Sequence, residues 1–332
     1  MVFVILGVTV LSFYLSRGIP GIDPVAAYVT ERTPDEVIEK LRIQLGLNQP
    51  LPIQYFYYLR DLISGNWGYS RSLTQPVVEA LAQRFPATFE LTMFAIILSV
   101  GIGVPLGIIS AIKNNRAPDH ASRLYALTGV SIPVFWFGLL LQIVFFYQFR
   151  QWGLPSLPSS GRFDAVLNLE HPIQHITGLA VLDSLITGNF IMTQDAIAHL
   201  ILPAFALSFI STGVIARIMR SSMMEVLRQD YIIMARSKGL SERVVIYRHA
   251  LKNALIPAVT VAGLIFGGLL SGAVLTETIF TWPGIGRLAA TSIIRNDTAL
   301  ILGFVIIAAA IVVIANLLVD ILYGYLDPRI KY

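Results

Sequence analysis

Charged and polar side chains are few in this 332-residue chain, and the densest group of them lies between Glu225 and Pro257. The basic members of this island, which stand beside only three acids, are Arg228, Arg236, Lys238, Arg243, Arg248 and Lys252. The chemistry that such a group offers is recognition. A basic loop between apolar segments can meet a soluble partner or simply fix the orientation of a membrane protein, and the physics of the island alone leaves both interpretations open.

No other residues form a predicted reaction centre. His171 and His175 are four apart and could share a helix face as metal ligands, but they lie beside Pro172 in a loop with no third ligand at a characteristic spacing. The chain also has no cysteine, so thiolate metal sites and disulfides are excluded. We therefore expect no catalytic residue, no metal and no cofactor in this chain, and we expect His199 and His249 to form hydrogen bonds.

Three common catalytic strings are missing. The sequence has no Gly-x-x-x-x-Gly-Lys-[Ser/Thr] string, so this chain should not hydrolyse ATP through a P-loop. It also has neither a Gly-x-Ser-x-Gly nor a His-Glu-x-x-His string, which would suggest an intramembrane hydrolase. Any energy for work must then arrive from a partner.

The island itself predicts a short amphipathic helix. Four apolar residues are spaced by 3, 4 and 3, which predicts a stripe on one helix face: Met224, Leu227, Tyr231 and Met234. A short amphipathic helix on a loop is suited to a groove on a soluble partner.

A second helix is predicted to follow after a hinge at Gly239. Arg236 and Lys238 lie in the last turn of the first helix, where cations complement the helix dipole. Glycine can adopt the left-handed conformation that ends a helix. Ser241 is then expected to cap the next helix, with Glu242 in its first turn.

The elements that hold this island are apolar segments of membrane-spanning length. With 55% hydrophobic residues, 13% charged residues and a mean hydropathy of +0.70, the chain lacks the composition of a soluble globular protein. A span needs about 20 residues, and five of six windows without Asp, Glu, Lys or Arg have 17 to 26 residues. The windows are 1–16, 91–112, 124–149, 200–216, 253–276 and 298–319. We therefore predict an all-α integral membrane protein with six transmembrane helices.

The window at 1–16 is the shortest of the six. No basic residue precedes it, and it does not end in the small-residue cleavage site of a signal peptide, so we expect an uncleaved, tilted first span.

The absence of charged residues from the predicted spans also argues against an ion-coupled secondary transporter, in which intramembrane Asp, Glu or His mark the ion path. Glu277 and Asp320 lie at predicted span ends, where capping or snorkelling is the expected role.

Basic residues at the ends of the spans predict the orientation. Three groups fall on one side of a six-span chain, and they are Lys113, Arg116 and Arg123, then Arg217 and Arg220 with the island, then Arg329 and Lys331. The positive-inside rule makes that side cytoplasmic, with both termini inside. The scatter of these residues, without an aromatic platform among them, argues against nucleic acid as a partner.

Three segments are then predicted to lie outside. Residues 17–83 are expected to form a small helical segment, with one helix beginning at Thr33-Pro34 and stopping near Gly46, and another over Ile53 to Ile63. Residues 150–199 begin with a Pro-, Gly- and Ser-rich stretch and are expected to form a loop over the membrane face. Residues 277–297 contain a Pro-Gly turn, with Phe280 and Trp282 expected at the lipid headgroup level.

The string from Tyr231 to Pro257 closely resembles the cytoplasmic signature loop of binding-protein-dependent ABC importer permeases. The resemblance is closest to the first permease of the oligopeptide/dipeptide group, in which an Ala-Arg-x-Lys-Gly-Leu string is typical, as at Ala235 to Leu240 here. Ile233 and Met234 depart from the general Glu-Ala-Ala signature. Further strings follow in the family's order at 45–55, 65–70, 84–92, 103–111, 131–141, 199–207, 220–231 and 277–288.

The resemblance implies a transport subunit that is not itself an enzyme. It implies the six-helix type I ABC importer fold in the cell membrane of a bacterium or archaeon, and passage of peptides from an external binding protein to the cytoplasm by alternating access. The implied partners are a second homologous permease, two ATP-binding subunits that hold ATP and Mg, an extracytoplasmic substrate-binding protein and membrane lipid. The same architecture importing oligosaccharides or a nickel chelate is an alternative, and a stand-alone secondary transporter is a remote one.

The resemblance also assigns residues and boundaries. Coupling to an ATPase subunit is expected of Tyr231, Met234, Ala235, Arg236, Lys238, Gly239 and Leu240. The expected extracytoplasmic signature loop contains Glu277, Phe280, Trp282, Pro283, Gly284 and Gly286. The expected organisation is a first helix at 1–16, an outer segment at 17–83, a permease domain at 84–323 and a tail at 324–332. Within the permease domain we expect spans at about 90–112, 124–149, 200–216, 254–276 and 298–319, with a coupling loop at 218–253.

Overall fold

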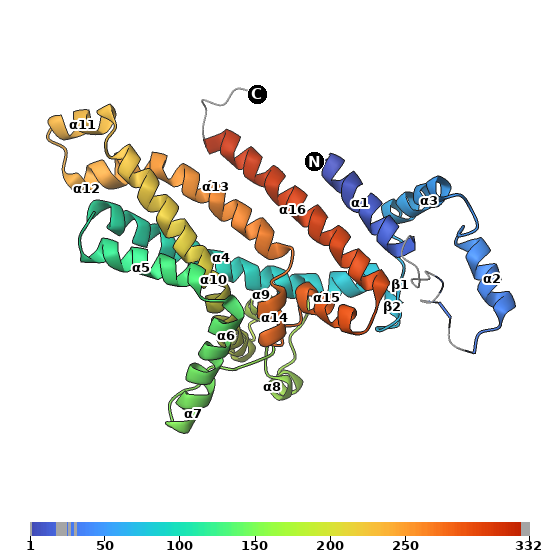
Figure 1. The fold of residues 1–332 in the computed structure, drawn as a ribbon. Coiled ribbons are helices and arrows are strands. Elements are labelled where there is room, and N and C mark those ends of the chain that lie inside the picture. Colours follow the sequence, from blue (N-terminus) through green and yellow to red (C-terminus); the bar gives the residue numbers. More distant parts are fainter. Residues whose placement is uncertain (1, 18–24, 26–27, 30–31, 327–332) are drawn as a thin grey trace.

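A computed structural model of the chain describes residues 2–17, 25, 28–29 and 32–326, and almost all of its regular structure is helical (Figure 1). The basic residues Arg329 and Lys331, and the predicted tail from 327 onward, lie outside the described residues. The predicted all-α class is therefore confirmed for the described chain, apart from one small two-stranded sheet.

The N-terminal part contains the helices that the sequence predicts. After α1 (Val2–Arg17) come α2 (Asp35–Gln44) and α3 (Leu51–Ile63), followed by the antiparallel strands β1 (Tyr69–Ser70) and β2 (Gln75–Pro76). Pro34 is the N-cap of α2, so this helix begins one residue later than predicted. Gly46 has φ +65°, a left-handed conformation that favours glycine and follows the end of the helix.

Four helices are long and apolar enough to cross a membrane. They are α4 (Val77–Ile112), α10 (Phe190–Val226), the continuous run Glu242–Leu270 and Thr298–Ile321 of α16 (Thr298–Leu326). The run Glu242–Leu270 joins α12 (Glu242–Val244), the π-helical turn η3 (Val245–Ala250) and α13 (Leu251–Leu270). Both α4 and α10 extend beyond the predicted spans, because helix continues into polar sequence at their ends.

The predicted span at 124–149 is broken. Helix α5 (Ala117–Ser131) meets the run Val134–Gln151 at an angle of 102°. That run consists of α6 (Val134–Gln142), the π-helical turn η2 (Ile143–Gln148) and α7 (Phe149–Gln151). The break lies at Ile132-Pro133, since proline lacks the amide hydrogen that a helix needs and disfavours helical backbone in the residue before it.

The described part of the chain thus has four candidate spans, or five if the bent pair is counted as one. Helix α1 is shorter than these, with 16 residues. The count of six spans remains a prediction.

The segments between the long helices are themselves partly helical. Residues 150–199 contain α8 (Ala165–Glu170) and α9 (Ala180–Ile186), and α14 (Val274–Ile279) and α15 (Ile285–Ile294) follow α13. The predicted loop at 277–297 is therefore mostly helix. The ends of the long helices that carry α11 lie on the same side as the start of α1 and the end of α16, whereas α8, α14 and α15 lie toward the other side (Figure 1).

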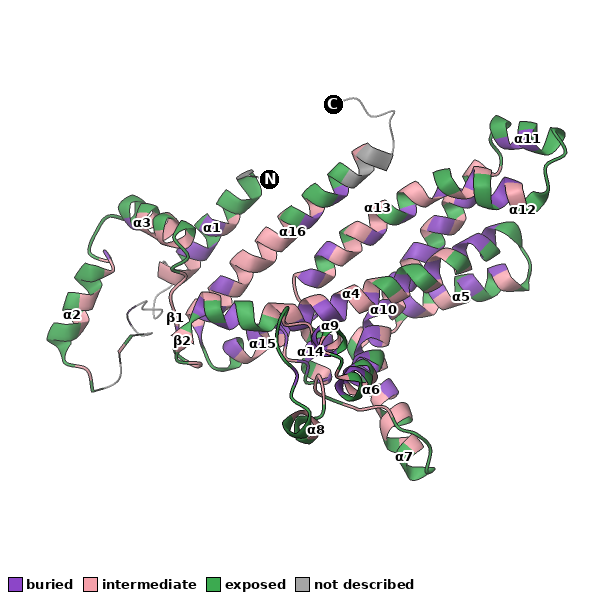
Figure 2. Cartoon of the chain, turned by 180° about the vertical axis from the view of Figure 1, so that it is seen from behind, coloured by how far each residue is buried: buried purple, intermediate pink, exposed green. Residues whose placement is uncertain are grey.

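Small residues let the long helices approach closely. A side chain added at Gly107 of α4 would come within 2.7 Å of the Ala216 carbonyl oxygen of α10. At Gly267 of α13 an added Cβ would lie 2.5 Å from the Cβ of Ala315 in α16. This is the packing expected of helices in lipid, where close backbone contact provides the attraction. Buried residues follow α4 and α10 through the centre of the molecule, while α2 and α11 are mostly exposed (Figure 2).

Candidate functional site

The polar island folds as a short helix held across the end of the long helices. Helix α10 ends at Val226, a turn follows, and α11 (Asp230–Ser237) then runs to Lys238, its C-cap. Gly239 has φ +76°, so the left-handed stop predicted for it is confirmed. Ser241 occupies the N-cap position of α12 as predicted, although its hydroxyl makes no capping hydrogen bond.

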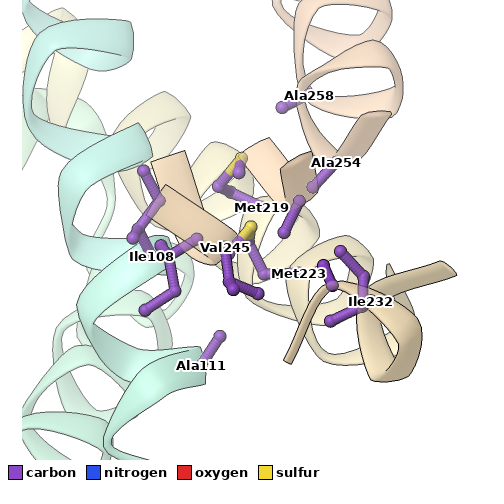
Figure 3. Close-up of a cluster of buried hydrophobic side chains, with 11 residues drawn as sticks. Ile108, Ala111, Met219, Met223, Ile232, Val245, Ala254 and Ala258 are labelled. Atoms are coloured by element: carbon purple, nitrogen blue, oxygen red, sulfur yellow. The ribbon is translucent and has the colours of Figure 1, made fainter. Parts of the chain in front are cut away.

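One face of α11 is seated on a buried apolar cluster. Ile232 and Ala235, three residues apart, are 0% and 7% exposed and pack with side chains of α4, α10, η3 and α13 (Figure 3). The other buried members of the cluster are Ile108, Ala111, Met219, Met223, Val245, Ile246, Ala250, Ala254 and Ala258. The cluster thus connects α11 with α4, α10, η3 and α13.

The predicted apolar stripe is wrong. Met224 belongs to α10 and Leu227 is its C-cap, whereas Tyr231 and Met234 belong to α11. The turn at 227–229 separates the two helices, so the four residues do not share a face. The spacing rule assumed one continuous helix, and the buried face of α11 is formed instead by Ile232 and Ala235.

The opposite face of α11 exposes apolar side chains. Tyr231, Ile233 and Met234 are 40%, 53% and 60% exposed, and Leu240 just beyond the helix is 40% exposed. Side chains of this size on a protruding helix normally mark a surface that meets a partner. Arg236 and Lys238 are exposed beside them, so the surface combines apolar contact with positive charge.

Two side-chain contacts fasten α11 to its neighbours. The Arg236 guanidinium donates to Glu242 Oε1 at 2.8 Å, across the turn that contains Gly239. Asn253 Nδ2 of α13 donates to the Tyr231 hydroxyl at 2.8 Å. Four of the seven predicted coupling residues lie on α11, Lys238 is its C-cap, and Gly239 and Leu240 follow. All seven predicted coupling residues therefore lie on α11 or in the turn that directly follows it.

Sequence reasoning missed a buried carboxylate near this end of the molecule. Asp119 is fully buried and accepts hydrogen bonds from Ser110 Oγ, the Asn115 amide, Arg123 and Arg220, at 2.6 to 3.2 Å. Arg220, predicted only to set the orientation, therefore also ties α10 to α5, whereas Arg123 bonds Asp119 within α5. The spacing of four residues between Asp119 and Arg123 on a helix was a signal for this pair.

A second group of predicted residues surrounds the Glu277 carboxylate. This side chain is fully buried, accepts from Thr88 Oγ1 of α4 at 2.7 Å and from the Arg287 amide of α15 at 2.8 Å. The predicted snorkelling is wrong, since the carboxylate lies in the interior. It does cap a helix, because it accepts from the Arg287 amide in the first turn of α15. Burial raises the pKa of Glu277 above its usual range, and the hydrogen bond from Thr88 opposes that shift.

Glycine makes this approach possible. An added Cβ at Gly284 would lie 2.5 Å from the Glu277 carboxyl carbon, and one at Gly286 would lie 3.0 Å from Glu277 Oε2. Pro283 before them is half-buried. Gly284 and Gly286 of the predicted signature loop are therefore explained by the space that the Glu277 carboxylate occupies.

The prediction that Phe280 and Trp282 lie at the lipid headgroups is wrong. Each is 1% exposed. Trp282 Nε1 donates to the Ala87 carbonyl of α4 at 2.7 Å, and the Phe280 ring packs against Gly138 of α6. Both aromatic rings fix the 277–297 segment to the bundle instead of anchoring it in lipid.

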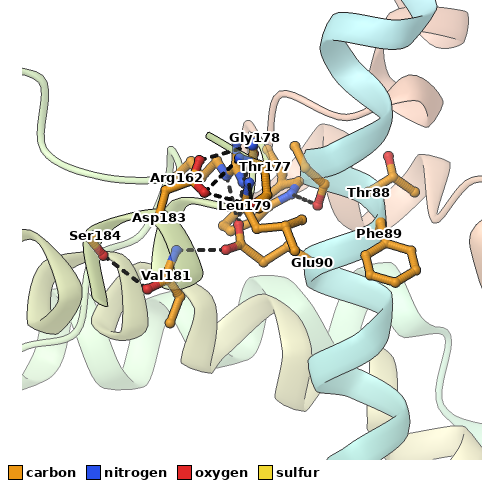
Figure 4. A network of polar contacts seen from close by, with 12 residues as sticks. Thr88, Phe89, Glu90, Arg162, Thr177, Gly178, Leu179, Val181, Asp183 and Ser184 are labelled. Atoms are coloured by element: carbon orange, nitrogen blue, oxygen red, sulfur yellow. Dashed lines mark hydrogen bonds and ion pairs between the residues drawn. The ribbon is translucent and has the colours of Figure 1, made fainter. Parts of the chain in front are cut away.

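A further charged pair fastens the 150–199 segment to α4. Glu90 is 3% exposed and accepts from Arg162 at 2.6 and 2.8 Å and from the Val181 amide at 2.8 Å (Figure 4). Nearby, Asp183 accepts from the amides of Ile176, Thr177 and Gly178 and from the Thr177 hydroxyl. The Glu90 contacts join residues 72 and 91 apart in sequence, so no local pattern could reveal them.

The histidines form no metal centre in the described chain. His171 and His175 are both exposed, and no group of three or more His, Cys, Asp or Glu in the described residues could hold a metal ion. The hydrogen-bonding role predicted for His199 is confirmed, since its Nδ1 lies 2.9 Å from the Asp195 carbonyl oxygen. For His249 the role stays a prediction.

Comparison with known proteins gives consistent matches over the full length. The family model described as binding-protein-dependent transport system inner membrane component matches residues 103–332, and the model for the N-terminal part of such components matches residues 1–92.

The similar proteins named below are transport permeases. The chain is 46% identical over 330 residues to the probable D,D-dipeptide transport system permease protein DdpB of Escherichia coli K12, covering 99% of this chain and 94% of that protein. It is 46% identical to the dipeptide transport system permease protein DppB of Alkalihalophilus pseudofirmus, with 99% and 96% covered. It is 36% identical to the oligopeptide transport system permease protein AppB of Bacillus subtilis, with 99% and 96% covered. A crystal structure of an amino acid ABC transporter with histidines aligns at 18% identity over 73% of this chain and 90% of its own, with a TM-score of 0.43 that is too low to carry an argument.

Proposed function

The chain belongs to the family of inner membrane components of binding-protein-dependent transport systems, and from that membership we propose that it is the permease subunit of an ATP-driven peptide importer. The names of its relatives, which transport dipeptides, D,D-dipeptides and oligopeptides, support peptides as the substrate. Sequence similarity covers 99% of the chain in each of these relatives, so the proposal applies to the whole protein.

The observation that carries the proposal is the two-sided construction of α11. Its inner face, Ile232 and Ala235, is packed against a cluster that touches α4, α10 and α13, while its outer face exposes Tyr231 and Met234. A partner bound to the outer face can therefore push or pull on the long helices. We assign the outer face as the contact with an ATP-binding subunit, with Arg236, Lys238, Gly239 and Leu240 at its edge.

In this assembly ATP and Mg are bound by two partner ATPase subunits, and this chain has no catalytic role. A second, homologous permease completes the membrane part. Closure of the ATPase subunits on ATP would move α11, and the long helices would follow, so that a central cavity between the two permeases opens alternately to each side. The lining of that cavity requires the second permease.

The side that carries α11 is then the cytoplasmic side, and both termini are inside. Arg123 and Arg220, which surround Asp119 at this end, support that orientation through the positive-inside rule. The segments 17–83 and 279–297 would face an external substrate-binding protein. The anchoring of 277–297 through Glu277 and Trp282 to α4 would carry the movement of the long helices to that surface.

The boundaries proposed from the sequence follow the same scheme. The first span corresponds to α1 and the outer segment 17–83 to α2, α3 and the two strands, with the permease domain at 84–323 and the inner tail at 324–332. The bent pair α5–α6 would be the third of six spans, and the coupling loop at 218–253 contains α11 and α12. The protein would reside in the cell membrane of a bacterium or archaeon.

Uptake into sealed vesicles tests the function. The complete complex would be reconstituted with ATP inside, and a radiolabelled dipeptide would be supplied outside with its binding protein. We expect accumulation that requires both ATP and the ATPase subunits. Uptake that continues after the ATPase subunits are removed would contradict an ATP-driven importer and favour a transporter that works alone.

A further inference from the structure

Helix α3 lies on the flank of the bundle, next to α1. Helix α1 packs against α16 and α3, away from the central pair α4 and α10. Figures 1 and 2 both show α3 beside α1, whereas α2 lies farther from the bundle. The two faces of α3 therefore have different surroundings, one formed by α1 and the other directed away from it.

The inner face of α3 meets α1 through tyrosine side chains. The Tyr55 hydroxyl lies 2.9 Å from Thr9 Oγ1 of α1. The rings of Tyr55 and Tyr58 lie 5.3 and 5.7 Å from the ring of Phe13, measured between centroids. This face of α3 is thus occupied by the first apolar helix of the chain.

These contacts lie within the apolar part of α1. Arg17 is the last residue of α1, and no charged residue precedes it in the sequence. At about 1.5 Å per residue, Phe13 lies about 6 Å and Thr9 about 12 Å inside that end. Val10 and Tyr14, which lie at the same level of α1, are exposed. Where α3 packs on it, α1 therefore presents apolar side chains to its surroundings, as a lipid-facing helix does.

The outer face of α3 is also apolar and exposed. Ile53, Phe56 and Ile63 are 41%, 64% and 88% exposed. Their spacings of three and seven residues place them on one side of the helix, opposite Tyr55 and Tyr58. Large apolar side chains gathered on one exposed face mark a surface of interaction.

The charged residue on this face, Arg60, is paired within α3 itself. Its guanidinium donates to Asp61 Oδ1 at 3.1 and 3.3 Å and lies over the Tyr57 ring, 5.1 Å from the centroid. A long cationic side chain can place its stem along apolar surface and its charge among lipid headgroups. Tyrosine is enriched at the same level of a membrane. The polar groups of α3 are thus the kinds found where lipid meets water.

Helix α2 has the opposite character. Five of its ten residues are charged and none is buried, whereas two of the thirteen residues of α3 are charged. The charged residues of α2 are Asp35, Glu36, Glu39, Lys40 and Arg42. Within the 17–83 segment, α2 is therefore suited to water and to a soluble partner, and α3 is suited to lipid.

We propose that α3 lies in the interfacial layer of the bilayer, with Ile53, Phe56 and Ile63 among the acyl chains and α2 in water. The apolar face of an interfacial helix lies about 5–10 Å into this layer, which overlaps the depth at which Tyr55 and Tyr58 meet α1. A soluble binding protein would have to enter the membrane to cover this face. The inference requires the protein to be in a membrane, and it depends neither on the transported substrate nor on the ATPase subunits.

Spin labels on single cysteines test the position of α3. The complete complex would be placed in vesicles of phosphatidylethanolamine and phosphatidylglycerol, with a label at Ile53→Cys, Phe56→Cys or Ile63→Cys. Ile43→Cys is the matched control, since Ile43 is an apolar residue of α2 that is 57% exposed. Electron paramagnetic resonance then compares collisions with oxygen, which concentrates in lipid, and with a nickel chelate, which stays in water.

We expect the three α3 labels to collide more with oxygen than with the nickel chelate, and the Ile43→Cys label to show the reverse order. Collision of the α3 labels mainly with the nickel chelate would place α3 in water and overturn the proposal. Weak collision with both reagents would mean that a second permease or the binding protein covers the face, which would also overturn it.

A pair of charge substitutions gives a readout that needs no label. In the same vesicles Phe56→Glu should lower the unfolding temperature, because a carboxylate among acyl chains is unfavourable. Ile43→Glu adds the same group to an exposed position of α2 and should leave the unfolding temperature unchanged. Both side chains are largely exposed within the chain, so equal effects of the two substitutions would contradict a lipid environment at α3.

Discussion

At the scale of single residues, one short stretch of α4 holds both segments at the end opposite α11. The Ala87 carbonyl accepts from Trp282 Nε1, Thr88 bonds Glu277, and Glu90 bonds Arg162. Each of these contacts is buried or nearly so, and buried polar groups that keep all their partners rigidify a structure. Residues 87–90 therefore fix the position of two segments, whose bonded residues Arg162 and Glu277 are more than 100 residues apart in sequence.

The Glu90–Arg162 pair should be far more important to stability than an exposed pair of the same kind. Glu90→Gln leaves the guanidinium, whose side chain is 11% exposed, without its counter-charge, and breaking one partner of a buried pair costs about 3–5 kcal/mol. We expect a lowered unfolding temperature and faster proteolytic cleavage within 150–199.

Glu242→Gln is the matched control, since the Arg236–Glu242 pair is 40% and 62% exposed and such pairs contribute about 0–1 kcal/mol. If both substitutions lowered the unfolding temperature equally, the Glu90 pair would not have the anchoring role assigned to it.

The Asp183 carboxylate should make the 150–199 segment sensitive to acid. Burial works to raise its pKa, but the hydrogen bonds from Thr177, Ile176 and Gly178 outweigh burial, and the pKa is held below its usual range. A depressed folded-state pKa contributes stability above the unfolded value of about 3.9, and that stability is lost as pH falls through the folded-state pKa.

The measurement is the unfolding temperature of the parent and of Asp183→Asn across pH. We expect the parent to be more stable at pH 7 and the difference to shrink below about pH 4. A difference that stays constant down to the lowest pH would show that the carboxylate charge is not what the three amides require.

Residue identity predicted some of these roles and not others. The sequence singled out Glu277, Gly284 and Gly286 through family strings, and the structure gives the physical reason, which is the space needed by a buried carboxylate. Their burial could not be predicted, because the partner Thr88 lies 189 residues away. The aromatic residues Phe280 and Trp282 fit a lipid interface by type, but tertiary contacts determine where they lie.

At the scale of elements, α11 is the part that the sequence located well and described poorly. The left-handed conformation of Gly239 and the cap at Ser241 follow local rules of helix termination. The end of α10 at Val226 does not, because no proline or glycine marks it in the sequence. The spacing of Met224, Leu227, Tyr231 and Met234 therefore suggested a single helix that does not exist.

The seating of α11 gives a prediction about its mobility. Ala235→Arg would place a guanidinium where the Ala235 side chain is 7% exposed among apolar groups, and a charge cannot be buried there without a partner. We expect the amides of 230–237 to lose hydrogen-exchange protection while those of α4 and α10 keep theirs.

Ser237→Arg adds the same side chain at an exposed position of the same helix. Its exchange should match that of the parent. Equal loss of protection in both variants would mean that the cluster does not hold α11 in place.

At the scale of the whole molecule, charge-free windows located the long helices but not their ends or their shape. Helix α10 runs from Phe190 to Val226, well beyond the window at 200–216, because helical backbone tolerates polar residues outside the apolar part. The 102° bend at Ile132-Pro133 also lay inside a window that contained no charge. Proline gave a local signal, but many helices continue past a proline, as α4 does at Pro86 and Pro105.

The orientation can be tested with single cysteines, because the chain has none of its own. Ser237→Cys on α11 and Ser156→Cys in the 150–199 segment are both at exposed positions. With a membrane-impermeant maleimide, we expect Ser156→Cys to react in intact cells and Ser237→Cys only after permeabilisation. The reverse pattern would contradict the cytoplasmic position of α11.

The central claim is that α11 transmits the work of an ATPase subunit to the long helices. Its most direct measurement is the ATPase rate of the reconstituted complex with and without peptide-loaded binding protein. We expect stimulation in the parent and in the control Val166→Asp, which alters an exposed residue of α8. Stimulation should be lost in Gly239→Pro and in Ala235→Arg, with both variants still present in the membrane. Unchanged stimulation in both variants would contradict the claim.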